Sequence, residues 1–173
     1  MPDRRSGADS VGTGNALESR LQPARIGRSG GVEGKMSQDR ATFLQLAELR
    51  LTEARLLLAN GLPSGAYYLA GYAIECAFKA FIAAGFRADE IPDKSRVNSI
   101  YTHDLKALLN LAGLKNPLED DMNESSELRE SWAIISKWSE HARYDIWTSD
   151  AAAAMLEAVG AADKGLLQWL QKR

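Results

Sequence analysis

The chain has 173 residues, which is enough for one domain with a hydrophobic core and short for two. Its 45% hydrophobic and 25% charged residues match ordinary globular proteins and exclude a collagen-like, coiled-coil-only or wholly disordered chain. The formal net charge of -2 argues against a protein built to coat nucleic acid or an anionic membrane, so any nucleic-acid site must be a local patch. The single cysteine, Cys76, excludes an intramolecular disulfide and zinc sites made of several thiolates, and it fits a reducing, cytoplasmic setting.

The composition changes sharply near Met36. Residues 1–35 hold seven of the fourteen glycines and none of the thirteen aromatic residues, so they cannot bury enough apolar surface to offset the entropy of ordering. We therefore predict a disordered tail over 1–35 and one folded domain over 36–173, and we hypothesise that the natural protein starts at Met36. The tail is slightly basic, so one hypothesis is a loose contact with RNA. We favour the alternative, an extension without a selected function. The tail lacks the apolar run of a secretory signal.

Two apolar helices are predicted at the start of the folded domain. The first follows a capping Ser37, has apolar residues at three- and four-residue steps, and ends at the turn over 61–63. The second follows a capping Ser64, is almost continuously apolar over 66–84, and ends at Gly85. Two charged residues within that run favour a helix at the centre of a bundle over a membrane span.

A loop and a short helix follow. The mixed charges over 86–101 predict a loop, after which Thr102 can cap a third helix that stops at 113–117, where a glycine and a proline stand. The acidic residues over 119–124 predict a linker. They could ligate a metal, but carboxylates near a helix N-terminus also complement the helix dipole, and we favour that solvated role.

Two more helices complete the predicted fold. Apolar residues at helical spacing predict a fourth helix over 126–143, and Thr148 or Ser149 can cap a fifth that runs to Leu170. No extended alternating segment rich in β-branched residues occurs. The sequence therefore predicts an all-α fold, an up-and-down bundle of four to five antiparallel helices with a disordered N-terminal tail.

Few residues are available for catalysis. The sequence has no glycine-rich phosphate loop and no metal-binding His–Glu motif, so we expect no cofactor and no metal. The two histidines are His103 and His141. A triad of His103, Asp104 and a serine can be drawn, but it lacks a nucleophile elbow. We expect His103, beside the capping Thr102, to be an exposed first-turn residue or a local hydrogen-bond donor, with a functional role as the alternative.

Glu75 and Lys79 are unusual on the most apolar helix. They are four residues apart in the favourable Glu-before-Lys order, which predicts an ion pair at the helix edge. The alternative is that Glu75 faces the end of the fourth helix and pairs with Arg143, since an unpaired buried carboxylate is costly.

A second candidate cluster lies where the fourth helix ends, at Trp138, His141, Arg143 and Tyr144. Arginine offers a planar fork of donors to a phosphate, and tyrosine or tryptophan offers a stacking surface to a base. The same residues could instead close the end of the bundle. For Trp138 we favour a place in the core. For Arg143 we favour neither ligand binding nor closure of the bundle end over the other.

The sequence resembles the HEPN family (higher eukaryotes and prokaryotes nucleotide-binding). The resemblance covers about residues 37–171 and rests on AYYLAGYAIECAFKA at 66–80, then THDL at 102–105, then Trp138 and the Arg-Tyr pair that ends at Tyr144. It implies an up-and-down helical bundle that often dimerises. It also implies one of three roles: a metal-independent RNase of toxin and defence systems, a partner of small nucleotidyltransferases, or a non-catalytic RNA- or nucleotide-binding module.

The chain departs from the nuclease members of that family. They carry an arginine, four to six intervening residues and a histidine late in the bundle, whereas here Arg129 and His141 have eleven residues between them and Arg143 follows the histidine. Arg96 and His103 match the spacing, but they lie on the connection into the third helix. Without the motif, attack by a ribose hydroxyl would lack its proton acceptor and its phosphate stabiliser.

Three functions follow as hypotheses. We prefer a catalytically reduced HEPN-like module that binds a nucleotide, RNA or a partner protein, with a site formed by Glu75, Lys79, Arg143 and Tyr144. Such a module would belong to a toxin-antitoxin or defence system, form a homodimer, and pair with a nucleotidyltransferase or an antitoxin protein. The first alternative is a metal-independent endoribonuclease with His141, His103 and Arg96 as candidate catalytic residues. The second is a purely structural helical assembly subunit.

Overall fold

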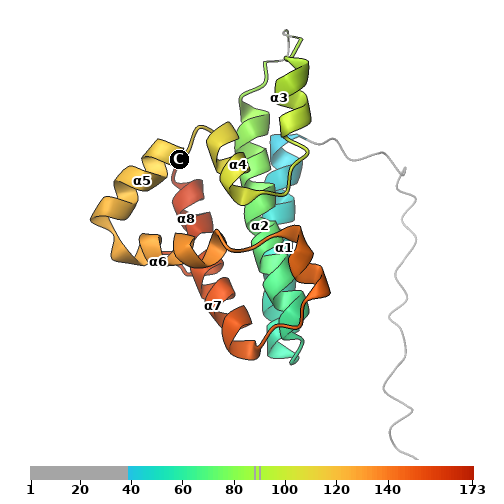
Figure 1. Ribbon diagram of the computed structural model, residues 1–173, viewed down its shortest axis with the longest axis vertical. Helices are drawn as coiled ribbons and strands as arrows, with labels where there is room; N and C mark the ends of the chain where they lie inside the picture. The colour runs from blue at the N-terminus through green and yellow to red at the C-terminus, as the bar shows by residue number, and fades with distance from the viewer. Residues whose placement is uncertain (1–38, 88, 90) are drawn as a thin grey trace, which may run out of the picture. The chain divides into compact units, whose positions relative to one another are not determined.

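The computed structural model describes residues 39–87, 89 and 91–173. The predicted tail and the predicted Ser37 cap lie outside this part of the chain. All regular structure in the described part is helical, which confirms the predicted all-α bundle (Figure 1).

The two long helices α1 (Arg40–Ala59) and α2 (Pro63–Ala84) pack along each other. The side chain of Asp39 caps α1 by accepting a hydrogen bond from the backbone N–H of Thr42. The turn between the helices contains Gly61 at a φ of 72°, a left-handed conformation that glycine adopts without strain. The predicted Ser64 cap is wrong, because α2 begins at Pro63, whose missing N–H costs nothing in a first turn.

The segment expected to be a loop over 86–101 contains a short helix, α3 (Lys94–Ser99), capped by Asp93. The next helix is α4 (Leu105–Leu111). Its N-cap is Asp104 and not the predicted Thr102, because the Asp104 carboxylate accepts hydrogen bonds from two first-turn N–H groups. Thr102 accepts a hydrogen bond from the N–H of Asp104 and so supports the cap.

The predicted acidic linker is wrong, because it forms helix α5 (Lys115–Glu124), which buries Leu118 and exposes Glu119, Asp120 and Glu124. The predicted fourth helix is also shorter than expected. Instead of one helix over 126–143, the chain forms α6 (Ser126–Ile135) and then a separate 3-10 helix, η2 (Glu140–Tyr144). The break lets the chain cross α2, where Trp138 lies so close to Gly71 that a Cβ there would stand 2.2 Å from the indole ring.

The predicted fifth helix is two helices, α7 (Ser149–Gly160) and α8 (Leu166–Gln171). Thr148 caps α7 through a hydrogen bond from the N–H of Ala151. A Cβ at Gly160 would meet the side chains of Arg55 and Leu51 at under 3 Å, so this glycine permits the close packing of α7 against α1.

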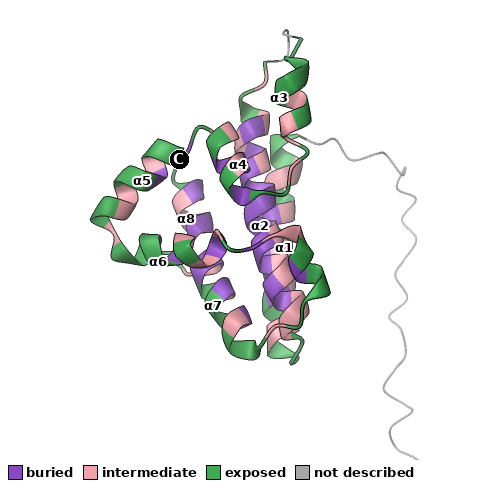
Figure 2. Ribbon diagram, in the orientation of Figure 1, coloured by how far each residue is buried: buried purple, intermediate pink, exposed green. Residues whose placement is uncertain are grey.

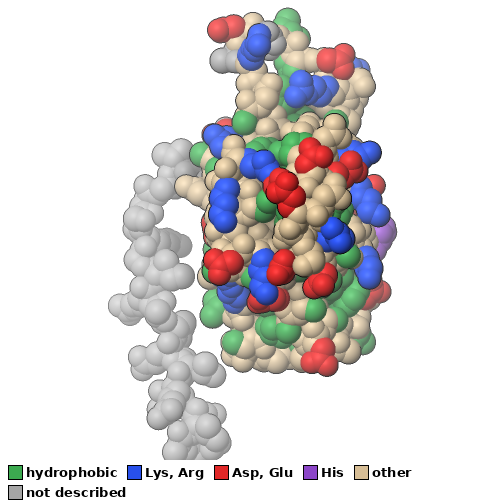
Figure 3. Space-filling view, turned by 90° about the vertical axis from the view of Figure 1, so that its left-hand side faces the viewer, with side chains coloured by type: hydrophobic (Ala, Val, Ile, Leu, Met, Phe, Trp, Pro, Cys, Tyr) green, Lys and Arg blue, Asp and Glu red, His purple; other side chains and the backbone are tan. Residues whose placement is uncertain are grey.

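Helix α2 forms the centre of the core. It packs against α1, α4, η2, α7 and α8, and twelve of its 22 residues are buried (Figure 2). Within the described residues, no helix combines the length and the apolar character that a membrane crossing needs. On the side of the molecule where α5 lies, acidic and basic side chains are interspersed (Figure 3). One charged residue, Glu75, is nevertheless buried on α2.

Candidate functional site

Glu75 lies in the middle of α2 with a side chain only 2% exposed. Its carboxylate has two partners. The ammonium of Lys79, one turn along α2, lies 2.8 Å from Oε1, and Nδ1 of His103 lies 3.0 Å from both carboxylate oxygens. The predicted pairing of Glu75 with Lys79 is therefore present, but in the interior rather than at a helix edge.

The pairing between Glu75 and His103 spans 28 residues. The Asp104 cap fixes the start of α4. His103, the residue before Asp104, then lies over the middle of α2. Because a carboxylate accepts hydrogen bonds, Nδ1 of His103 is the donor and Nε2 is left for a ligand. The His103 side chain is 48% exposed, so it connects the buried carboxylate with the solvent.

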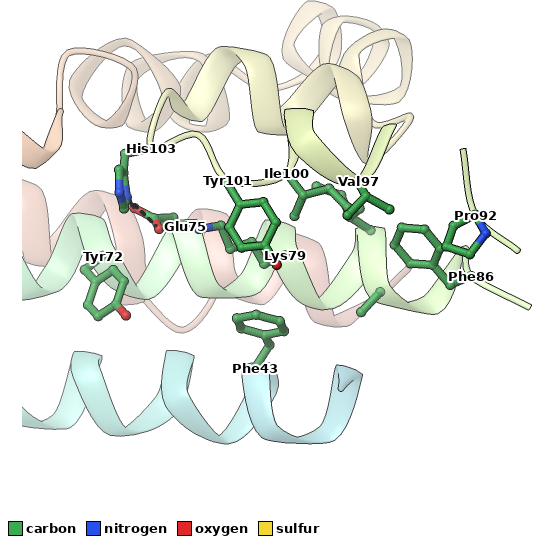
Figure 4. Close-up of a pocket in the computed structure, with 12 residues that line it drawn as sticks. Phe43, Tyr72, Glu75, Lys79, Phe86, Pro92, Val97, Ile100, Tyr101 and His103 are labelled. Atoms are coloured by element: carbon green, nitrogen blue, oxygen red, sulfur yellow. Dashed lines mark hydrogen bonds and ion pairs between the residues drawn. The ribbon is translucent and has the colours of Figure 1, made fainter. Parts of the chain in front are cut away.

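These three side chains line one end of a pocket of about 400 Å³, which we call the Glu75 pocket. Phe86 and Pro92 lie at the other end, and Tyr101 lies across the middle (Figure 4). The pocket lies between α1, α2 and the segment that carries α3 and leads into α4. The remaining lining residues are apolar or aromatic and are Phe43, Tyr72, Ile82, Ala83, Val97 and Ile100.

The Glu75 pocket combines an apolar body with a small polar end. Its volume lies within the range of about 300–1,000 Å³ that small-molecule sites span. The charges of Glu75 and Lys79 cancel, so the polar end offers hydrogen bonds rather than a strong field. Lys79 has two further N–H donors beyond the one that Glu75 accepts, and His103 adds Nε2. Such a site suits a flat ring with polar edges.

Two groups beside Glu75 have shifted pKa values. Burial, followed by the nearby Cys76 and Glu75, raises the pKa of Tyr72 to about 12. Burial and then Glu75 raise the pKa of Cys76 to about 11. Both side chains are therefore neutral at physiological pH, and Tyr72 presents an uncharged ring to the pocket.

Arg143 and Tyr144 do not lie at Glu75, so the alternative pairing of Glu75 with Arg143 is wrong. They belong to η2, where Arg143 lies over the Tyr144 ring at 4.9 Å. Hydrogen bonds to Tyr144 and then to Tyr68 raise the pKa of Arg143 above its ordinary value. We call Tyr68, Arg143 and Tyr144 the Arg143 cluster.

The other candidates are apart from this pocket. His141 is exposed on η2, where its Nε2 lies 3.5 Å from the carboxylate of Glu140. Arg96 is exposed on α3 and lies over the ring of Phe86, outside the lining of the Glu75 pocket. Trp138 is buried, as favoured, against Gly71 and 6.0 Å from the ring of Tyr68.

Sequence reasoning missed three pocket residues, Phe43, Tyr72 and Tyr101. Phe43 and Tyr72 have the helical spacing of core residues, and Tyr101 stands in a segment expected to be a loop. The available signal was the pair of charges on an apolar helix, since buried charges need partners. It pointed to the right helix face but not to the distant residues opposite it.

Among the described residues, no group of three or more His, Cys, Asp or Glu side chains is arranged to hold a metal ion. Comparisons of the chain with protein-family models, with curated proteins and with solved structures found no match.

Proposed function

We propose that the chain is an HEPN-like, non-catalytic nucleotide- or RNA-binding module in which the Glu75 pocket receives a nucleobase. The observation that carries this proposal is Glu75, a buried carboxylate that holds Lys79 and His103 at the polar end of an aromatic-lined pocket. The resemblance of 66–80 and 102–105 to the HEPN family supports the same class of ligand, and these segments contribute Glu75, Lys79 and His103.

The chemistry of a base matches the two ends of the pocket. Every base has an apolar face that stacks on aromatic rings, and an edge with ring nitrogens or carbonyl oxygens that accept hydrogen bonds. Phe43, Tyr72 and Tyr101 provide the aromatic surface, and Lys79 provides N–H donors at the polar end. When Nδ1 of a neutral His103 donates to Glu75, its Nε2 accepts a hydrogen bond from an N–H group on the edge of the base.

The charge balance defines which part of a nucleotide enters. Because Glu75 neutralises Lys79, the pocket has little attraction for a phosphate dianion, which strong sites hold with several unpaired cations. We therefore place the base inside and the phosphate outside. It follows that a nucleoside and its monophosphate bind the pocket with similar affinity.

A titration of the full chain tests this proposal. Binding of the common ribonucleosides and their monophosphates would be followed by calorimetry, with Tyr101→Ala and Lys172→Ala compared with the wild type. Removing the Tyr101 ring should weaken binding about fivefold, the low end of the loss for one stacking partner. Because Tyr101 is 72% exposed, the substitution should not unfold the protein. Lys172→Ala, at an exposed cation beyond α8, is the control that should change nothing. No binding at millimolar concentration, or equal binding by Tyr101→Ala, would refute the base pocket.

The wider context is also part of the proposal. As an HEPN-like module, the protein would act in the cytoplasm as a homodimer, in a toxin-antitoxin or defence system, beside a nucleotidyltransferase or an antitoxin protein. Co-purification of the endogenous protein with such a partner is the corresponding test, and recovery of the protein as a lone monomer would contradict it.

A metal-independent endoribonuclease is the second candidate function, and one observation favours it. Glu75 holds Nδ1 of His103, an arrangement in which a carboxylate orients an imidazole so that Nε2 can take a proton. Incubation with labelled single-stranded RNA in EDTA separates the two functions. We expect no cleavage. Cleavage that His103→Ala abolishes and His141→Ala retains would establish the nuclease instead.

A further inference from the structure

The Glu75 pocket and the Arg143 cluster are connected by contacts along α2. Tyr68 and Tyr72 stack with ring centroids 6.3 Å apart, and Tyr72 lines the pocket. Arg143 lies on η2, which packs on α2, and Tyr68 is near enough to contribute to the raised pKa of its guanidinium. A continuous series of aromatic rings therefore leads from the pocket to an exposed guanidinium.

The crossing of the chain over α2 presents Arg143 at this place. Trp138 packs on Gly71, where no side chain separates the two segments, and lies 6.0 Å from the ring of Tyr68. Ala142, just before Arg143, is buried and anchors η2 against the body of the protein. Arg143 is thus held close to Tyr68 by the packing of η2.

The two regions differ in charge in a way that assigns them different parts of one ligand. The Lys79 ammonium is paired with a carboxylate, whereas Arg143 lies over the ring of Tyr144 and forms no ion pair found in the described part of the chain. Its guanidinium therefore keeps its full positive charge for an anion. A planar guanidinium beside tyrosine rings suits a phosphate next to a stacked base.

We propose that the Glu75 pocket and the Arg143 cluster form one binding site for a single-stranded oligonucleotide, with a base in the pocket and a backbone phosphate at Arg143. The proposal rests on the proposed function of the pocket and names its ligand class. Lys79 lies eleven residues after Tyr68 on α2, a rise of about 16 Å at 1.5 Å per helical residue. A stacked strand advances about 3.4 Å per nucleotide, so this span matches several nucleotides and not one.

The test compares ligands of two lengths on the full chain. A single-stranded RNA of about ten nucleotides and the corresponding mononucleotides would be titrated against the wild type, Arg143→Ala, Arg143→Lys and Lys172→Ala. We expect the oligonucleotide to bind at least about tenfold more tightly than any mononucleotide, and Arg143→Ala to remove most of that gain. The Lys172→Ala control should retain it.

The salt dependence adds a readout that a merely structural role of Arg143 would not change. Loss of one phosphate contact should reduce the slope of log affinity against log salt by about 0.7 for a single strand. Arg143→Lys keeps the charge, so it should keep most of the slope while losing part of the affinity.

The outcomes separate this inference from the function on which it rests. Mononucleotide binding that depends on Tyr101, with no gain for the oligonucleotide, would overturn the extended site and leave the base pocket standing. A gain that Arg143→Ala does not change would also overturn it. Absence of binding by both ligands would refute the pocket and the extended site together.

Discussion

The Glu75 pocket and the Arg143 cluster use charge in opposite ways. Glu75 is buried and fully engaged, and the charges that it holds are almost cancelled within the protein. Arg143 is exposed and lies over the ring of Tyr144. A charge in the interior mainly fixes other groups in place, whereas a charge at the surface remains available to a ligand. The two regions should therefore respond differently to substitution.

The largest effect is expected from Glu75→Ala. The substitution leaves Lys79, whose side chain is only 14% exposed, without its counter-charge, so the protein should lose about 3 kcal/mol of unfolding free energy. Chemical denaturation measures the loss. The matched control is Glu119→Ala, which removes an exposed pair with Lys115 and should cost under about 1 kcal/mol.

A double substitution sharpens this prediction. If the cost of Glu75→Ala comes from the isolated ammonium, adding Lys79→Ala should recover part of the lost stability. Equal or greater loss in the double variant would show that Glu75 stabilises the fold through contacts other than the ion pair.

Gly71→Ala should have the next largest effect, because it disrupts the close contact between Trp138 and α2 that holds η2 on α2. The new methyl group would overlap the indole of Trp138, which is packed in the core, and overpacking of this kind costs about 1–3 kcal/mol. Thermal unfolding of Gly65→Ala is the control. The Cβ added there meets only a flexible leucine end at 3.0 Å, and alanine favours the helix, so its stability should be unchanged or higher.

High pH should destabilise the neighbourhood of Glu75 by a smaller and gradual amount. Burial raises the pKa of Cys76 from 9.0 to about 11 and that of Tyr72 from 10.0 to about 12, so the unfolded chain loses these protons at lower pH than the folded protein does. Stability is thus complete below about pH 9 and falls as the pH rises towards about 12. In Tyr72→Phe, the free energies of unfolding measured by chemical denaturation at about pH 8 and about pH 11 should differ less than in the wild type. An equal difference would contradict the assignment.

The smallest effect on stability is expected from Arg143→Ala. The side chain is exposed and belongs to no ion pair found in the described part of the chain, so the free energy of unfolding should stay close to that of the wild type. Far-ultraviolet circular dichroism and thermal unfolding check this directly. A large loss of helicity would show that Arg143 is structural and would weaken the contrast between the two regions.

The sequence was sufficient for the helical class and for the two long helices, because apolar periodicity and the turn over 61–63 are strong local signals. It was insufficient where tertiary packing decides. The break between α6 and η2 depends on the fit of Trp138 against Gly71, which no local pattern shows. Helix α5 was missed because its acids obscure the single buried Leu118.

The candidate site was predictable only where it depends on neighbouring residues of one helix. Glu75 and Lys79 stood out because charges on an apolar helix need a reason, and their pairing follows from helix geometry alone. The contact with His103 depends on how the segment before α4 folds back over α2. Arg143 lies near Tyr68 and not near Glu75 because the segment leading into η2 packs on the N-terminal half of α2, at Gly71.

The most direct test of the base pocket is a nuclear magnetic resonance titration of the isotope-labelled chain with a mixture of ribonucleosides. We predict that the amide shifts of Lys79, Tyr101 and His103 move together in a saturable way, while those of α5 and α8 do not. Shifts confined to η2, or no saturable change at the three pocket residues, would contradict the claim that this pocket receives a base.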